Sequence, residues 1–104
     1  MKEYNKLIRD RIPEIIESNG GKAQFRTLTE EEYPSYLEAK LDEEVGEYHR
    51  DKNAEELADI LEVVYALAAD LGVSREELMD IYQKKHDARG GFEKKYLLIR
   101  TENS

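Results

Sequence analysis

The chain of 104 residues is long enough for one domain, and it carries a formal net charge of −8 with 39% hydrophobic and 38% charged residues. So few apolar residues favour a protein that completes its core by pairing with a copy of itself. The absence of cysteine excludes disulfides and thiolate metal sites. No run of 18 apolar residues occurs, and the first residues lack an apolar signal region, so we expect a cytoplasmic protein that spans no membrane.

The negative charge is concentrated in one block of the sequence. Residues 30–62 hold 13 acids and 3 bases, a local balance of −10, whereas the rest of the chain balances at +2. A field of this sign argues against binding to nucleic acid, because the phosphate backbone would be repelled. It permits a site for divalent cations, whose own charge would invert the local electrostatics.

The N-terminal part of the chain predicts a helix followed by a short strand. The helix spans roughly residues 10–19, with Pro13 in its first turn and Gly20 at its C-terminal end. Residues 22–28 then show partial alternation with aromatic and β-branched side chains, which is typical of a strand.

The second predicted helix has two alternative starting points. Thr29 and Glu32 form the pattern of a capping box, which would open the helix there. Pro34 is uncomfortable so far inside a helix, so the helix either begins at Pro34 or bends there. Its apolar positions continue to Tyr48, and it ends near Arg50.

Two further helices and a tail complete the prediction. Asn53 can cap the third helix, whose wide apolar arc is typical of a central helix. Ser74 and Glu77 form another capping box at the start of the fourth. The apolar tail, residues 95–101, has the length of a strand and could pair with residues 22–28 in a small two-stranded sheet.

The second and third helices each carry a pair of acids three residues apart. Glu44 and Glu47 share one helical face, and so do Glu56 and Asp59. The pairs are placed symmetrically about a short break, so a tight helical hairpin would bring all four carboxylates together. Such a cluster is costly unless cations neutralise it, and oxygen ligands select hard ions such as Mg²⁺ or Mn²⁺. An ordinary solvated acidic face is the alternative interpretation of these pairs.

Three motifs in this order resemble one known superfamily. The segments KLIRDRIPEII, KLDEEVGE followed by EELAD, and RGGFEKKYLL are similar to the all-α nucleoside triphosphate pyrophosphohydrolases. The pattern is nearest to the small MazG-like, phosphoribosyl-ATP-pyrophosphohydrolase-like proteins, and the match covers nearly the whole chain. The resemblance implies an all-α, four-helix bundle-like fold over residues 1–104 as one domain, assembled as a homo-oligomer (dimer or tetramer).

The resemblance also implies an activity. The expected reaction is Mg²⁺-dependent hydrolysis of a nucleotide between its α and β phosphates, giving a nucleoside monophosphate and pyrophosphate in nucleotide house-cleaning. The implied metal ligands are Glu44, Glu47, Glu56 and Asp59. Either Glu44 or Glu47 would take the proton from the attacking water, and Glu43 would assist.

Several basic residues are candidates to bind the substrate phosphates. Lys40 lies four residues before Glu44, where a helix-surface ion pair is an equal alternative. The glycines after Arg89 either allow close approach to a ligand or simply end the helix. The full set of candidates is Arg9, Arg11, Lys40, Lys84, Arg89 and Lys94.

Two other functions fit the same sequence. One is a dedicated phosphoribosyl-ATP pyrophosphohydrolase, which the chain resembles only loosely. The other is a non-catalytic acidic helical module that binds divalent ions or a partner protein. The second predicts that function survives the loss of Glu47 or Asp59, which distinguishes it from an enzyme.

Overall fold

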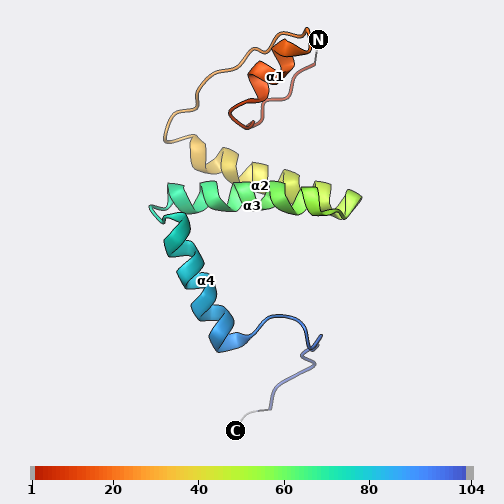
Figure 1. The fold of residues 1–104 in the computed structure, drawn as a ribbon, viewed down its shortest axis with the longest axis vertical. Helices are drawn as coiled ribbons and strands as arrows, with labels where there is room; N and C mark the ends of the chain where they lie inside the picture. Colours follow the sequence, from red (N-terminus) through yellow and green to blue (C-terminus); the bar gives the residue numbers. More distant parts are fainter. Residues whose placement is uncertain (1, 103–104) are drawn as a thin grey trace.

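The computed structural model describes residues 2–102, and its regular structure consists of four helices (Figure 1). These are α1 (Ile12–Ser18), α2 (Tyr33–Asp51), α3 (Ala54–Asp70) and α4 (Arg75–Arg89). The predicted all-α class and the number of helices are confirmed. Within residues 2–102 no helix is long and apolar enough to cross a membrane.

The predicted two-stranded element is wrong. Residues 22–28 and 95–101 are extended or irregular, and the described part of the chain contains no strand. The two segments lie toward opposite ends of a molecule that measures 63 × 31 × 23 Å (Figure 1). An isolated pair of strands is marginally stable in water without a surface to pack on, and the single chain provides none for these two segments.

Side chains cap the starts of α3 and α4, and a capping box precedes α2 by one turn. The hydroxyl of Thr29 accepts a hydrogen bond from the Glu32 amide, and the Glu32 carboxylate accepts one from the Thr29 amide. A turn follows this capping box, and α2 begins with Tyr33, so Pro34 lies comfortably in its first turn. The reciprocal bonds of Ser74 and Glu77 likewise form the predicted capping box of α4.

A two-residue link joins α2 to α3 and fixes the hairpin that the acid pairs require. Lys52 adopts left-handed backbone angles (φ 48°, ψ 48°) and ends α2, while its amide still donates to the Tyr48 carbonyl. Asn53 then caps α3 by accepting a hydrogen bond from the Glu56 amide at 3.0 Å. So short a connection makes the two helices neighbours along their length.

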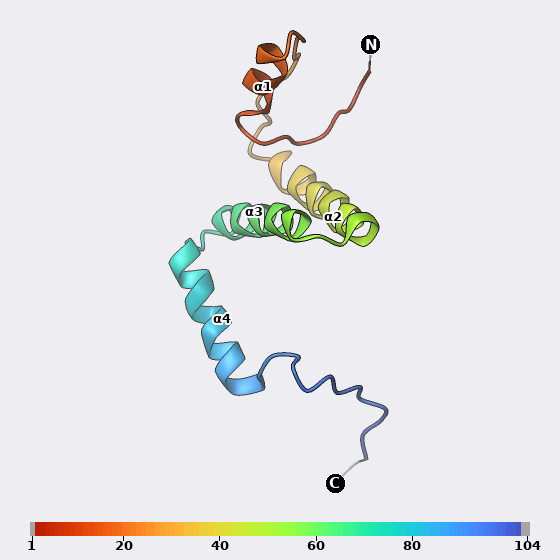
Figure 2. The same ribbon diagram turned by 45° about the vertical axis from the view of Figure 1, so that its right-hand side comes forward.

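The α2–α3 hairpin is the body of the structure, and α4 leaves it at an angle (Figures 1 and 2). The start of α4 contacts α3, whereas α1 makes no close contact with another helix. The buried apolar residues of the described chain all belong to α2 and α3: Leu37, Val63 and Ala68. The four helices are therefore not gathered into one closed bundle within a single chain.

Candidate metal centre

The α2–α3 hairpin brings carboxylates from both helices together. Glu44 of α2 and the pair Glu56 and Asp59 of α3 each offer an oxygen atom, and these atoms lie within 4.8 Å of one another. Glu43, Glu44 and Glu47 meet the same criterion on α2. The symmetric placement seen in the sequence thus becomes a real cluster, with Glu44 belonging to both groups.

Glu44 is the buried member of the cluster. Only 6% of its surface is exposed, which is rare for a glutamate. Its Oε1 atom lies 3.2 Å from Lys40 Nζ, but its Oε2 atom is buried without a hydrogen-bond partner. Glu56 Oε2 is unpartnered in the same way. Buried polar atoms without partners are costly, and a cation held between the carboxylates of Glu44 and Glu56 would offset that cost.

Two lysines partly neutralise the α2 side of the cluster. Lys40 Nζ lies 2.9 Å from Glu43 Oε2, and Lys6 Nζ lies 3.3 Å from the same oxygen. Lys40 is largely buried, so its contacts with Glu43 and Glu44 are better shielded from solvent than an ordinary surface pair. Of the two alternatives for Lys40, the structure shows the ion pair.

An arginine from the N-terminal segment reaches the α3 side. Arg9 contacts Asp59 Oδ1 at 3.3 Å and Glu62 Oε1 at 3.2 Å, across some fifty residues of sequence. On the opposite helix Arg50 approaches Glu47 at 3.9 Å. The cluster therefore combines acids that can hold a cation with bases that could meet a bound anion.

The electrostatic environment separates the acids into two kinds. Burial raises the pKa of Glu44, the charge of Glu47 adds to this, and Lys40 only partly offsets them. Desolvation also raises the pKa of Glu56, together with repulsion from Asp51, Asp59 and Glu44. The pKa of Glu43 is lowered instead, because hydrogen bonds from Lys40 and Lys6 outweigh its burial. The two acids with raised pKa values are those with unpartnered buried oxygens, so they carry the unsatisfied negative charge.

The remaining predicted substrate-binding residues lie away from the cluster. Arg11 pairs with Glu14 at the start of α1. Lys84 and Arg89 are exposed on α4, which does not contact α2, and Lys94 follows α4 in an exposed segment (Figure 2). Within one chain, the structure joins only Arg9 and Lys40 of the six predicted bases to the acids.

The sequence did not predict how closely three residues, Lys6, Glu43 and Glu62, take part in the ion pairs around the cluster. Glu43 falls on the far side of the helical wheel from the apolar stripe, yet it is half-buried because Lys6 and Lys40 cover it. Glu62 shares Arg9 with Asp59. The spacing of Asp59 and Glu62, three residues apart on α3, was the available signal for the latter contact. No local pattern pointed to Lys6.

Chemically, the cluster suits a hard divalent cation. It offers carboxylate oxygens without histidine or cysteine, and such ligands favour Mg²⁺, Mn²⁺ or Ca²⁺ over zinc. Clustered surface acids are common without a metal, so the distinguishing observation is the burial of Glu44 and its free oxygen. The residues present therefore fit a hard divalent cation, the class to which the predicted Mg²⁺ belongs.

Comparisons with known proteins add a relative of unknown function. The chain is 56% identical over 41 residues to an uncharacterized protein of Mycolicibacterium smegmatis. The alignment spans 39% of this chain and 42% of that protein. No protein-family model matches the chain, and no solved structure matches it.

Proposed function

We propose that this protein is a Mg²⁺-dependent nucleotide pyrophosphohydrolase. It would cleave the bond between the α and β phosphates of a nucleoside triphosphate, releasing a nucleoside monophosphate and pyrophosphate, in cytoplasmic house-cleaning. The observation that carries the proposal is the buried, unpartnered Glu44 oxygen beside Glu56 and Asp59. The resemblance of the three sequence motifs supports the choice of reaction.

In this proposal Glu44, Glu56 and Asp59 hold the cation, with Glu47 beside them. Bound Mg²⁺ would supply charge neutralisation for the phosphates and acidify a water molecule. Glu47 is half-buried and also lies next to Glu44, so it is the carboxylate best placed to accept the proton of that water. Mn²⁺ is the expected substitute, because it accepts the same oxygen ligands.

The bases at the cluster would serve the phosphates. Arg9 is more than half exposed, and its contacts with Asp59 and Glu62 are of modest strength, so a phosphate could displace them. Its planar guanidinium suits bidentate recognition of phosphate oxygens. Lys40 is held by two glutamates and serves instead to limit the repulsion around Glu44.

A direct assay tests the proposal. The purified protein is incubated with common and modified nucleoside triphosphates and with phosphoribosyl-ATP, first with Mg²⁺ and then with EDTA. Monophosphate and pyrophosphate are expected as products, and EDTA should abolish both. A preference for phosphoribosyl-ATP would select the dedicated enzyme of histidine biosynthesis.

Two matched variants decide whether the cluster is responsible. Glu56→Gln should reduce turnover by at least a hundredfold, because it removes a predicted metal ligand. Glu55→Gln makes the same chemical change on the neighbouring, exposed residue and should leave turnover unchanged. Absence of turnover with Mg²⁺ and Mn²⁺ in a folded wild-type protein would refute the enzyme and favour the ion- or partner-binding module.

A further inference from the structure

The segment that precedes α1, residues 2–9, forms an N-terminal arm without helix or strand, which runs past α2 (Figure 2). Two of its side chains make ion pairs with the hairpin. Lys6 Nζ lies 3.3 Å from Glu43 Oε2 of α2. Arg9 lies 3.3 Å from Asp59 Oδ1 and 3.2 Å from Glu62 Oε1, both of α3. The arm therefore bridges the two helices that form the acid cluster.

The ion pairs are the specific attachment of the N-terminal arm to the hairpin. Within residues 2–102, no backbone hydrogen bond joins the arm to α2 or α3. A cavity of about 140 Å³ lies between the arm and α2, with Leu7 and Tyr36 among its lining residues. The side chain of Lys6 is 39% exposed and that of Arg9 is 57% exposed, so each ion pair is individually weak. An ion that competes for the acids could therefore exchange with the arm.

The two bases of the arm divide the acid cluster between them. Glu43 belongs to the acid group on α2, and Asp59 belongs to the group that spans α2 and α3. Each of the two groups thus has one acid paired with the arm. The buried oxygens without partners belong to Glu44 and Glu56, which the arm leaves unpaired.

The two bases of the arm carry the same charge as a divalent cation. The five acids of the two groups have a formal charge of −5, which Lys40 and Arg50 of the hairpin reduce to −3. Lys6 and Arg9 of the arm reduce it further to −1. A divalent cation in place of the arm would leave the same −1, whereas the cation and the arm together would reverse the sign. Because like charges in a partly buried site repel each other, the two occupants are expected to compete.

We propose that the N-terminal arm is the protein's own counter-charge for the acid cluster, and that a divalent cation displaces it. The proposal rests on the cation of the proposed function but not on the reaction. Without a cation, Lys6 and Arg9 limit the repulsion among the acids. The arm is an incomplete substitute, because it leaves buried oxygens of Glu44 and Glu56 without partners, and a cation held between these carboxylates offsets that cost.

The competition acts in both directions. If the arm weakens cation binding by a certain factor, the cation weakens the attachment of the arm by the same factor. Displacement would also leave Arg9 beside a bound cation without its carboxylate partners. In the proposed reaction, cation binding would therefore prepare Arg9 to bind a phosphate group of the nucleotide.

The affinity for Mn²⁺, measured by the loss of the EPR signal of free Mn²⁺, tests the competition without any turnover. Arg9→Gln and Lys6→Gln each remove one base of the arm, and each should lower the dissociation constant for Mn²⁺ by at least about fivefold. Lys2→Gln is the matched control, because it removes the same charge from a residue whose described contact is the Tyr4 ring. It should change the dissociation constant by less than about twofold, since salt screens a distant exposed charge. Dissociation constants for Arg9→Gln and Lys6→Gln that equal or exceed the wild-type value would overturn the proposal.

The mobility of the arm provides a second readout. The heteronuclear NOE of the backbone amides of residues 4–9 is compared in EDTA and at saturating Mg²⁺. It should fall when Mg²⁺ binds, because the loss of the ion pairs lets the arm move on the picosecond to nanosecond timescale. An unchanged or higher NOE of these amides with Mg²⁺ would contradict displacement.

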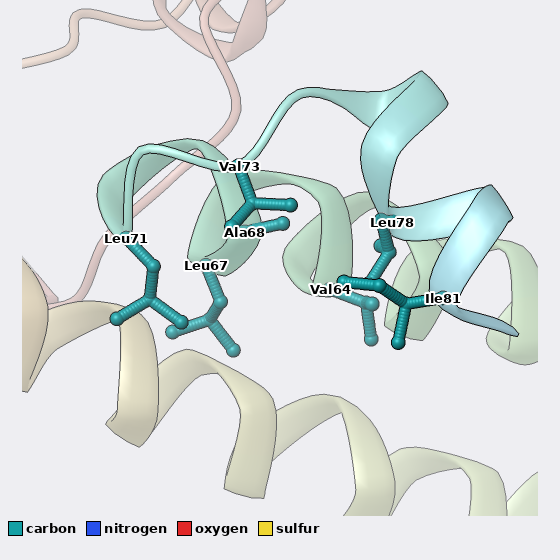
Figure 3. Close-up of a pocket in the computed structure, with 7 residues that line it drawn as sticks. All are labelled: Val64, Leu67, Ala68, Leu71, Val73, Leu78 and Ile81. Atoms are coloured by element: carbon teal, nitrogen blue, oxygen red, sulfur yellow. The ribbon is translucent and has the colours of Figure 1, made fainter. Parts of the chain in front are cut away.

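The groove between the end of α3 and the first turns of α4 serves as the internal reference for this measurement (Figure 3). The close-up shows apolar side chains gathered there, and no charged side chain lines the groove. The amides of Leu67 and Leu78 should therefore keep their NOE when Mg²⁺ binds. A fall at these positions as large as in the arm would mean that the whole structure loosens, which would also overturn the proposal.

The two measurements separate this proposal from the proposed function. If Mn²⁺ binds equally to the wild type and all variants and the arm keeps its NOE, displacement is wrong while the metal centre stands. If Mn²⁺ does not bind at all, both the displacement and the cation of the proposed function are wrong. A protein that releases its arm on binding the cation but hydrolyses no nucleotide would support this proposal and refute only the proposed reaction.

Discussion

Replacing Glu44 by glutamine should have opposite effects with and without a divalent cation. In EDTA the variant should melt at a higher temperature than the wild type, because the substitution removes a negative charge that burial and Glu47 disfavour. The glutamine oxygen can still accept a hydrogen bond from Lys40, which also keeps its contact with Glu43. The variant therefore loses little and relieves a buried, unpartnered carboxylate.

A bound divalent cation should reverse this order, so that the wild type melts at a higher temperature than Glu44→Gln. A cation present at a hundred times its dissociation constant stabilises the folded state by about 2.7 kcal/mol. For a chain of this length that free energy raises the melting temperature by roughly 10–20 °C. Glu44 offers an oxygen to both acid groups, so Glu44→Gln should abolish most of the rise.

Thermal unfolding followed by circular dichroism, in EDTA and in a Mg²⁺ titration at constant ionic strength, measures both effects. Glu38→Gln is the matched control, because Glu38 is an exposed acid on the same helix outside both acid groups. Glu38→Gln should change neither the melting temperature in EDTA nor the rise in melting temperature on adding Mg²⁺. A lower melting temperature for Glu44→Gln in EDTA, or an equal gain from Mg²⁺ in wild type and variant, would refute the reasoning.

Three further predictions concern the elements that hold the site in place. Asn53→Ala removes the cap of α3 and should lower the free energy of unfolding by about 1 kcal/mol. The melting temperature should fall by roughly 4–8 °C, and an unchanged melting temperature would mean that the cap is dispensable. Lys52→Gly relieves a left-handed residue and should be neutral or stabilising by up to about 1 kcal/mol in urea unfolding, whereas Lys52→Val should destabilise; the reverse order would contradict this backbone conformation. The pKa of Glu32 should be about 2 by NMR titration, because Arg26 and the Thr29 amide bind its carboxylate. This pKa lies below the ordinary 4.5, so the contribution of Glu32 to stability is present above pH 4.5 and is lost as the pH falls through about 2. Arg26→Gln should raise the pKa of Glu32, and an unchanged pKa in that variant would refute the contact.

The parts of the fold that could be predicted from sequence are those fixed by neighbouring residues. The caps at Asn53 and Ser74 depend on a side chain and an amide three residues apart, so a short pattern is sufficient. The cluster of Glu44, Glu56 and Asp59 was predictable because a two-residue link leaves the hairpin almost no choice of register. In both cases the deciding geometry lies within about one helical hairpin.

The contacts that could not be predicted join distant segments. Arg9 meets Asp59 fifty residues later, and no periodicity encodes that approach. The same limitation produced the false two-stranded element, since residues 22–28 and 95–101 have strand-like composition but no shared surface. The direction in which α4 leaves the hairpin could not be predicted either. The sequence of an apolar face does not determine whether the same chain or another one covers it.

The locality of the α2–α3 hairpin has a consequence for the order of events during folding. Its two helices are joined by a two-residue link, and contacts between close neighbours in sequence form fastest. The acids of α2 and α3 are therefore expected to come together before Arg9 and Lys6, in the segment that precedes α1, contact them. During that interval only the bases of the hairpin itself, Lys40 and Arg50, offset the repulsion among its acids. Dissolved divalent salt would therefore assist folding early, before it serves as a ligand of the finished protein.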